Sequence, residues 1–221
     1  MSQVEKHFNS IASQYENYKK NSWYYYQNIK ELYQKIIPPG QKVLEIGCGT
    51  GDIISFVNPQ YGVGIDISPA MISLAKQKYP MIYFKIARIE NFKTEKQFDY
   101  IFLADVVEHL EDIPAAIVGI RRVCNNETRV IFTYANPLWE PILIFLEKMG
   151  LKMPEGPHYR IPFHKLKKIL MKYDFKVLER GWKLLVPAYI PGLSNFINRF
   201  FYHVPLLKRL GMLEYIIIKK K

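Results

Sequence analysis

The sequence predicts an α/β protein in which a doubly wound, mostly parallel sheet carries helices on both faces. Short apolar runs that are typical of buried strands alternate with helical patterns from residue 29 to residue 133. This alternation favours parallel strands joined by right-handed crossovers. The chain has 221 residues, of which 49% are hydrophobic, so one large domain with a sizeable core is expected over residues 1–221.

A helical pattern precedes the sheet. Ile29, Leu32, Tyr33 and Ile36 repeat at helical spacing and stop before the segment 38–40, Pro-Pro-Gly. Proline cannot continue a helix, and it disfavours the helical conformation in the residue before it. Residues 1–40 are therefore expected to form an N-terminal helical cap ahead of the first strand.

The first strand, Lys42–Ile46, turns into three alternating glycines, Gly47, Gly49 and Gly51, followed by Asp52. Glycines at a strand exit let the backbone approach a ligand closely. A pyrophosphate site has the spacing G-x-G-x-x-G and favours an anion at the helix N-terminus. Here the spacing is G-x-G-x-G, and a carboxylate at Asp52 would repel a pyrophosphate. A ligand with a positive group and no phosphate fits better.

The second strand, Tyr61–Asp66, ends in an acid that lies 21 positions beyond Glu45. An acid about 20 residues past a glycine turn can accept hydrogen bonds from both hydroxyls of a ribose. Ser68 followed by Pro69 is a typical start of the next helix and leaves Asp66 free for such a role. Further strands are expected at residues 82–86, 98–104, 128–133, 175–185 and 213–218.

Three motifs resemble those of class I S-adenosylmethionine-dependent methyltransferases. V-L-E-I-G-C-G-T-G at 43–51 resembles the first motif, and F-D-x-I with V-x-E-H-L within 98–110 resembles the fourth. Residues 8–16 resemble a segment of the small-molecule members, including the ubiquinone and menaquinone group. The resemblance covers residues 8–136 and implies a Rossmann-like sheet of about seven strands with an antiparallel last strand. It also implies S-adenosylmethionine as cofactor, and its ammonium and sulfonium agree with the charge argument.

The resemblance further implies which residues bind that cofactor. Asp66 would bind the ribose, and Tyr15 would cover the site; the apolar face of a helix explains the spacing of residues 8–15 equally well and is compatible with that role. Arg88 stands where the family has an acid or amide; either Arg88 stacks on the adenine or backbone groups at Ile89 hold it. The expected set is Tyr15, Glu45, Gly47, Cys48, Gly49, Gly51, Asp66, Ile67, Met71, Arg88, Ile89, Ala104 and Val106.

Removal of a proton from the acceptor would need a base. His109, Asp105 and His158 are the catalytic residues that we expect, with Glu108 as a further carboxylate. His109 could instead make a structural hydrogen bond at a helix start. One branch of the family holds a magnesium ion with acids and a histidine near this position; Glu108 and His109 permit such an ion, but no metal is predicted.

The positive charge of the chain is concentrated towards its end. The net charge is +11, and residues 137–221 hold 16 basic and 6 acidic residues, whereas residues 1–136 are nearly balanced. This asymmetry favours an anionic partner or substrate side, although a solvated lysine-rich surface would also explain it. Two insertions, residues 137–163 and 186–212, exceed what the sheet needs and are expected to form a substrate-binding lid.

The second insertion carries an apolar stripe at helical spacing, with bases beside it. The stripe consists of Leu193, Phe196, Ile197, Phe200, Phe201 and Val204, and the bases are Arg199, His203, Lys208 and Arg209. Such a helix can lie in an anionic membrane interface or cover a lipid-like substrate. The alternative is a helix that packs its stripe on the domain's own core. Prolines and polar residues exclude a membrane span here.

The expected function is methyl transfer from S-adenosylmethionine to a small-molecule or amphiphilic acceptor. An RNA or protein methyltransferase is the first alternative, but nucleic acid is disfavoured because no N-P-P-Y-like tetrapeptide follows the fourth strand. A non-catalytic cofactor-binding module that docks on a membrane or a protein is the second. Two cysteines without zinc or disulfide spacing and an N-terminus without a signal-peptide pattern favour a cytoplasmic protein, and the basic C-terminal part allows contact with a membrane surface.

Overall fold

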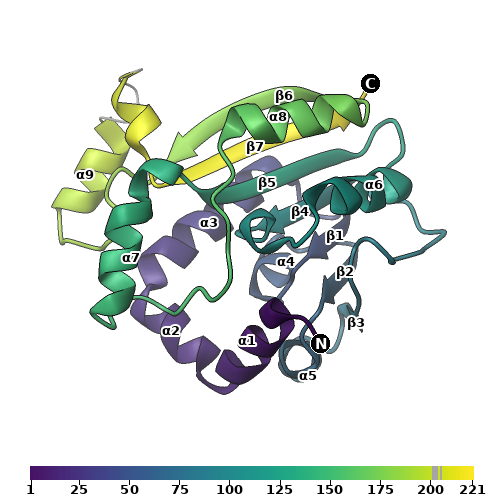
Figure 1. Ribbon diagram of the computed structural model, residues 1–221, viewed down its shortest axis with the longest axis horizontal. Coiled ribbons are helices and arrows are strands. Elements are labelled where there is room, and N and C mark those ends of the chain that lie inside the picture. The colour runs from purple at the N-terminus through teal and green to yellow at the C-terminus, as the bar shows by residue number, and fades with distance from the viewer. Residues whose placement is uncertain (201–203, 205) are drawn as a thin grey trace.

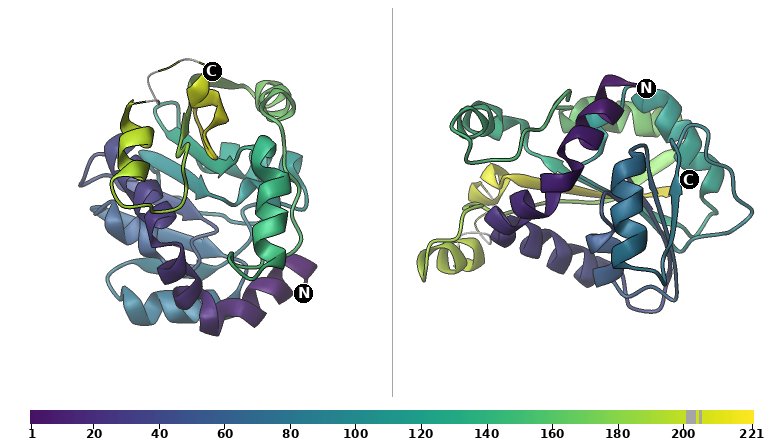
Figure 2. Two further views of the ribbon diagram at one scale, coloured as in Figure 1. Left: turned by 90° about the vertical axis from the view of Figure 1, so that its left-hand side faces the viewer. Right: turned by 90° about the horizontal axis from the view of Figure 1, so that it is seen from below.

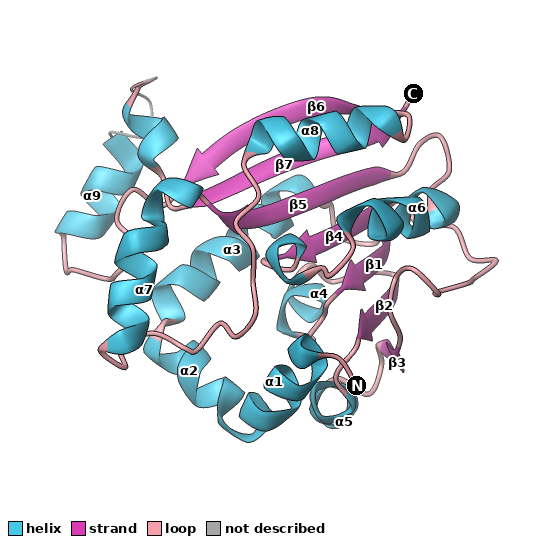
Figure 3. Ribbon diagram, viewed as in Figure 1, coloured by secondary structure: helices cyan, strands magenta, loops and turns pink. Residues whose placement is uncertain are grey.

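The protein is described by a computed structural model that covers residues 1–200, 204 and 206–221. Its centre is a seven-stranded sheet of order β3-β2-β1-β4-β5-β7-β6, with helices on both faces (Figures 1 and 3). β7 runs antiparallel to both of its neighbours, and the other paired strands are parallel. The predicted fold class is confirmed.

Strands and helices follow one another along the chain nearly as the sequence predicts, and two strands have the predicted bounds. The strands are β1 Lys42–Ile46, β2 Tyr61–Asp66, β3 Tyr83–Ile86, β4 Tyr100–Ala104, β5 Arg129–Ala135, β6 Phe175–Lys183 and β7 Leu213–Lys220. The described helices are α1 Gln3–Ile11, α2 Tyr15–Asn21, α3 Trp23–Ile36, α4 Asp52–Phe56, α5 Pro69–Lys78, α6 Ile113–Val123, α7 Glu140–Lys148, α8 Phe163–Lys172 and α9 Leu193–Phe200.

The sheet separates two hydrophobic cores. Helices α6 and α8 cover one face and bury Ile117, Ile120 and Leu166, while α3, α4 and α5 cover the other. On that second face, the buried Tyr33 donates its hydroxyl hydrogen to the carbonyl of Leu103 at 3.0 Å. This bond fastens α3 to β4 close to the carboxyl end of the strand.

The N-terminal segment is not one continuous helix. α1 ends at Ile11, a 3₁₀ turn spans Ala12–Gln14, and α2 begins at Tyr15. The helix expected over residues 8–15 is interrupted by this turn, but Ala12 is buried and Phe8, Ile11 and Tyr15 are half-buried, so these residues still form an apolar face against the protein. Figure 2 shows α1, α2 and α3 as a bent succession along one side of the sheet.

Both insertions contain a helix, α7 in residues 137–163 and α9 in residues 186–212. Of the apolar stripe expected in the second insertion, Phe201 lies outside the described residues, as does the basic neighbour His203. Among the helices of the described part of the chain, none has the length and apolarity that crossing a membrane would need. Whether the insertions act as a lid stays a prediction.

Gly119 in α6 should be intolerant of a side chain. A Cβ there would overlap the carbonyl oxygen of Ile89, a backbone atom that cannot move away independently. Gly119→Ala gains about 1 kcal/mol of helix propensity, but overpacking typically costs about 1–3 kcal/mol. We expect a net loss in the free energy of unfolding, measured by urea denaturation. Val118→Ala on the exposed side of α6 is the control and should change stability little; a stabilised Gly119→Ala would contradict the packing.

Candidate active site

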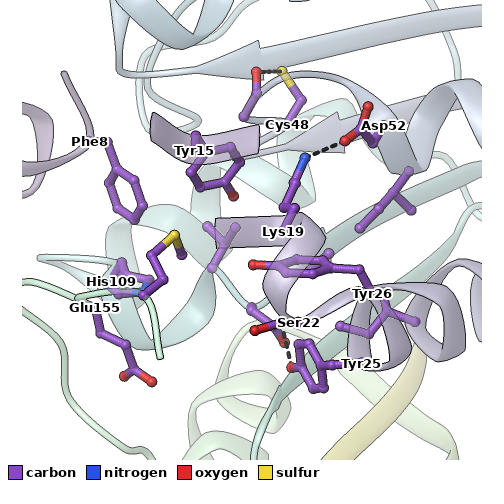
Figure 4. A pocket seen from close by; sticks show the side chains of 18 of the residues that line it. Phe8, Tyr15, Lys19, Ser22, Tyr25, Tyr26, Cys48, Asp52, His109 and Glu155 are labelled. Atoms are coloured by element: carbon purple, nitrogen blue, oxygen red, sulfur yellow. Dashed lines mark hydrogen bonds and ion pairs between the residues drawn. The ribbon is translucent and has the colours of Figure 1, made fainter. Parts of the chain in front are cut away.

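A cavity of about 920 Å³ lies beside the carboxyl ends of β1, β2 and β4. The crevice outside these strand ends is where open α/β sheets bind ligands. Its wall also includes α2, α3 and parts of both insertions, so that segments from most of the chain contribute. Figure 4 shows the side chains of Tyr15, Tyr25, Tyr26 and His109 around it.

The turn after β1 brings backbone to the cavity wall. Gly47 and Gly49 have φ values of 71° and 51°, a left-handed conformation that favours glycine. The amide N–H groups of Gly47 and Cys48 donate to the carbonyl of Ile65 in β2, at 2.7 and 3.0 Å. A Cβ at Gly47 would overlap the side chain of Val106. These contacts hold the ends of β1, β2 and β4 together.

Asp66 closes β2 at the edge of the cavity. Its two carboxylate oxygens accept hydrogen bonds from the backbone N–H of Gly49, at 2.9 Å, and of Ser68, at 2.8 Å. A carboxylate has about four acceptor positions, so two remain for a ligand. Burial raises the pKa of Asp66. Ser68 caps α5 through its hydroxyl, which accepts from the N–H of Met71 at 3.1 Å, as predicted.

All but one of the expected cofactor-binding residues line this one cavity. Gly51 is the exception: it lies behind the turn, where a Cβ would overlap the ring of Phe84. Its φ of 79° lies in the left-handed region that favours glycine, so Gly51 allows the turn to form and does not contact the cavity. The lining includes Tyr15, Glu45, Gly47, Cys48, Gly49, Asp66, Ile67, Met71, Arg88, Ile89, Ala104 and Val106.

The charge of Asp52 is neutralised within the protein. The sequence favours a different role, in which this carboxylate acts on the ligand and repels a pyrophosphate. Lys19 and Lys78 each contact one of the Asp52 oxygens at 2.5 Å, and Tyr79 donates to this carboxylate at 2.7 Å. These two lysines outweigh the effect of burial and hold the pKa of Asp52 well below its usual range. Repulsion of a pyrophosphate by Asp52 is therefore not a sound reason for choosing the ligand.

Lys19 is a cavity residue that sequence reasoning missed. It follows Tyr15 by one helical turn in α2, and its ammonium lies 4.7 Å from the centre of the Tyr15 ring. It also donates to the hydroxyl of Thr50 at 2.8 Å, which ties α2 to the glycine turn. The i, i+4 spacing of Tyr15 and Lys19 is the signal that could have revealed it. The Tyr15 ring itself lies over Gly49, as a covering residue would.

On another side of the cavity, Arg88 has a partner within the protein. Its guanidinium contacts the carboxylate of Glu111 at 2.8 Å, and both residues line the cavity. Ile89 is buried and also contributes to the wall. Both expected modes of adenine contact are therefore compatible with the structure. The guanidinium plane of Arg88 can stack on the ring, or the backbone at Ile89 can bind it.

Asp105 follows β4 in an unusual backbone conformation, with φ 55°. Such a conformation costs a non-glycine residue energy and is concentrated at functional sites. Its carboxylate accepts from the hydroxyl of Tyr25 at 2.7 Å. Burial raises the pKa of Asp105, which suits a group that takes up a proton near neutral pH.

His109 lines the cavity in a defined tautomer. Its Nδ1 lies 3.0 Å from the carbonyl oxygen of Pro157, which can only accept, so Nδ1 carries the hydrogen. Nε2 therefore keeps its lone pair. Burial lowers the pKa of His109 to about 4, so the ring is neutral at physiological pH. Phe8 packs edge-on against it, with 5.3 Å between the ring centres.

His158 does not line the cavity, although its ring centre lies 6.1 Å from that of His109. Its ring nitrogens contact the carbonyl of Gly156 at 2.9 Å and the carboxylate of Glu140 at 3.0 Å, so neither is available to a substrate. It belongs to a cluster around Arg160, whose guanidinium contacts the carboxylates of Glu108, Glu140 and Glu155. We therefore assign His158 a positioning role in the loop between α7 and α8.

Arg160 is the second residue that sequence reasoning missed, because its acidic partners come from three separate segments. It is 6% exposed, and Glu108 is equally buried. The N–H of Tyr159 donates to the carbonyl of Glu108 at 2.7 Å, so backbone and side chain together fix the loop to the turn that carries His109. Burial raises the pKa of Glu108. Within the described residues, no group of three or more His, Cys, Asp or Glu side chains is arranged to hold a metal ion.

Fold and cavity together define an α/β protein of the nucleoside-binding kind. The chain belongs to the methyltransferase domain family, whose model matches residues 18–180. This family uses S-adenosylmethionine. The chain is 30% identical over 180 residues to the ubiquinone biosynthesis O-methyltransferase of Pelagibacter ubique. The match covers 71% of this chain and 75% of that protein.

Two solved structures share the fold of this chain. The magnesium protoporphyrin IX methyltransferase of Synechocystis, solved with bound S-adenosylhomocysteine, matches with a TM-score of 0.70 and 19% identity over 99% of this chain and 98% of that one. A methyltransferase structure from Thermotoga maritima matches with a TM-score of 0.74 and 17% identity over 99% and 100%. Against several other curated relatives the chain spans only 34% to 52% of their length.

Removing Arg160 should destabilise the protein strongly and in a pH-dependent way. Arg160→Leu leaves buried carboxylates without a counter-charge, which typically costs about 3–5 kcal/mol. A carboxyl whose pKa is raised in the folded state stabilises it below the unfolded pKa and loses that contribution as the pH rises through the folded pKa. Urea denaturation should therefore show a larger loss at pH 8 than at pH 5.

The control for this prediction is Arg121→Leu, which removes an exposed ion pair with Asp174. Exposed pairs contribute about 1 kcal/mol or less, so stability should change little at either pH. A loss in Arg160→Leu that is equally small, or one that does not vary with pH, would contradict the buried cluster.

Proposed function

We propose that the chain is an S-adenosylmethionine-dependent methyltransferase that acts on a small-molecule or amphiphilic acceptor. The observation that carries this proposal is Asp66, buried at the end of β2 beside the glycine turn, with acceptor positions left over in a large cavity. The family membership supports the activity. Relatives named for ubiquinone biosynthesis and for magnesium protoporphyrin IX support a small-molecule acceptor, since both names refer to one.

The residues present fit this cofactor. The left-handed glycine turn exposes backbone to the cavity, Asp66 can bind both hydroxyls of a ribose, and Tyr15 lies over the turn as a cover. Lys19 also lines this side of the cavity, where its ammonium holds Asp52 and Thr50 and so keeps α2 against the glycine turn. When bound, S-adenosylmethionine supplies an activated methyl group on a sulfonium, and the protein's part is to position the two reactants in a dry site.

His109 and Asp105 are the bases that we propose for the acceptor. His109 presents a neutral ring with its Nε2 lone pair unused by the hydrogen bond to Pro157. Asp105 is held by the hydroxyl of Tyr25 and has a raised pKa, so it can take up a proton that a buried carboxylate of ordinary pKa would not. Aromatic side chains from α3, Tyr25 and Tyr26 among them, line the same part of the wall and would exclude water.

Asp66→Ala should weaken binding of S-adenosylhomocysteine at least about tenfold, because a hydrogen bond to a charged acceptor contributes about 1.5–3 kcal/mol. Isothermal titration calorimetry measures this directly. Asp112→Ala is the matched control: Asp112 caps α6 by accepting from Ala115 and does not line the cavity. Asp112→Ala should lower the stability of the protein, because α6 loses its cap, and should leave the affinity for S-adenosylhomocysteine at the parent value. Unchanged affinity in Asp66→Ala would remove the basis of the proposal.

His109→Ala should lower turnover by about 10²-fold to 10⁴-fold, the range of general base catalysis. Affinity for S-adenosylhomocysteine should stay nearly unchanged, because the proposed role of the His109 side chain is at the acceptor and not at the ribose. The control is His7→Ala, which removes a histidine that bonds Pro154 outside the cavity. If His109→Ala lost affinity and turnover equally, its role would be structural.

The acceptor class is tested with a methyl-labelled cofactor and a cell extract that is afterwards separated into lipid, water-soluble, protein and RNA fractions. We expect the label in lipid or in a water-soluble metabolite. Label in RNA or protein would favour the macromolecular alternative. Cofactor binding without any labelled product would favour a non-catalytic binding module.

A further inference from the structure

Exposed apolar side chains are concentrated at one side of the molecule. More than half of the large hydrophobic side chains that are exposed in the described residues lie in the segments 138–151 and 189–210, which make up less than a fifth of the chain. Apolar patches of this extent mark interaction surfaces in soluble proteins. We call the following set the apolar rim: Leu138, Ile142, Phe145, Met149, Leu151, Leu193, Phe200, Leu206 and Leu210.

Helix α7 divides its apolar residues between two sides. Leu143 is buried against Ala135 and Met212, and Leu146 lines the cavity. Phe145 and Met149 are instead 61% and 60% exposed. The helix is therefore apolar on its outer side as well as its inner side, although only the inner side has a partner within the described protein.

Helix α9 is oriented opposite to an ordinary surface helix. Two of its polar residues bond the protein: Ser194 is fully buried and bonds both Ile190 and Ala188, and the half-buried Asn198 bonds the N–H and the carbonyl of Val186. Its apolar residues face outward, with Leu193 47% and Phe200 60% exposed. A surface helix normally has the reverse arrangement. Of the described residues of the stripe, Leu193, Phe196, Phe200 and Val204 are exposed and Ile197 is half-buried, so most of the described stripe does not pack on the domain's own core.

The hydrogen bonds of α9 explain why it is held in this orientation. Asn195 accepts from the hydroxyl of Tyr24 at 2.9 Å, and Asn198 donates to the same hydroxyl at 3.1 Å. Rotating the helix to bury its apolar face would break these bonds to α3 and leave buried polar groups unsatisfied. The outward apolar face is thus fixed by specific contacts, and an apolar medium outside the protein would stabilise it.

Charge selects among the apolar partners that this face could meet. Residues 184–213 contain Arg199, Lys208 and Arg209 but no acidic residue. Lys148 ends α7. A second copy of the chain would bring the same bases together and be repelled, whereas an anionic lipid surface would be attracted by about 1 kcal/mol per base. Aromatic and aliphatic side chains with flanking bases are the composition of interfacial membrane-binding helices.

The position of the rim relative to the cavity agrees with this partner. The left view of Figure 2 shows α7 and α9 on either side of one face of the molecule. Residues of both insertions line the cavity, among them Leu146 and Leu151 from one and Ala188 and Tyr189 from the other, and Leu151 also belongs to the apolar rim. The apolar rim is therefore continuous with the cavity wall.

We infer that the apolar rim, with the bases beside it, docks this protein on an anionic lipid membrane. The two helices lie in the headgroup region with Phe145 and Phe200 towards the acyl chains, and neither crosses the bilayer. An amphiphilic acceptor dissolved in the membrane then reaches the cavity between the two segments. This last step rests on the proposed function, whereas membrane binding itself does not.

The test is co-sedimentation of the protein with vesicles of phosphatidylglycerol and phosphatidylcholine in equal parts, at low salt. The protein should pellet with these vesicles and much less with phosphatidylcholine alone. Phe145→Glu combined with Phe200→Glu should weaken binding at least about tenfold, because each ring loses about 1.5 kcal/mol or more of apolar burial. Arg199→Gln combined with Arg209→Gln should weaken it about thirtyfold through lost attraction.

Matched controls carry the same charge changes at the far edge of the sheet. Met81→Glu with Tyr83→Glu places two acids on exposed residues beside β3, and Lys93→Gln with Lys96→Gln removes two exposed bases nearby. Both control variants should bind as the parent does. Affinity for S-adenosylhomocysteine, measured on every variant, should stay at the parent value, and this readout tests the cofactor site separately from the membrane face.

Three results would overturn the inference. The first is failure of the parent protein to pellet with anionic vesicles although it binds S-adenosylhomocysteine. The second is an equal loss of binding in rim and control variants, which would show general charge attraction. The third is a stable dimer in light scattering that Phe145→Glu with Phe200→Glu dissociates while vesicles leave the parent unbound, which would make the rim an interface between two copies.

Discussion

The structure depends on the left-handed turn that joins β1 to α4. Gly47 can take its conformation only without a side chain, because Val106 occupies the space that a Cβ would need. This close approach lets the amides of Gly47 and Cys48 bond the carbonyl of Ile65, so that β1, β2 and β4 end at a common point. Asp66 then fastens the second half of the turn through the N–H of Gly49. The wall of the cavity follows from these few contacts.

Two groups of ion pairs close the cavity on its open sides. On one side, Lys19 and Lys78 each pair with Glu16 and with Asp52, and so connect α2 with α4 and α5. On the other, Arg160 gathers three carboxylates and fixes the loop after α7. Buried ion pairs contribute little net stability because desolvation offsets their attraction. Their effect is to fix where mobile segments lie relative to the strand ends.

The outward apolar face of α9 is an exception to the rule that hydrophobic residues are buried. Its polar side chains are satisfied inside by Tyr24, Val186 and Ala188, which stabilises the helix in this orientation without apolar burial. The protein therefore retains apolar surface next to its cavity in water. Surface of this kind lowers the free energy of association with a lipid interface, and its cost in the free protein is offset by the internal hydrogen bonds.

The sequence by itself determined the sheet, the order of its strands along the chain, and the residues around the glycine turn. These depend on local signals: the period of apolar residues, glycines at a strand exit, and an acid at the end of Tyr61–Asp66. Only the tertiary structure decided that Asp52 forms ion pairs with two lysines, that His158 and Arg160 bind the same carboxylate, and that α9 turns its apolar side outward. Each of these features depends on contacts between residues that are far apart in the sequence, and a local sequence pattern carries no information about such contacts.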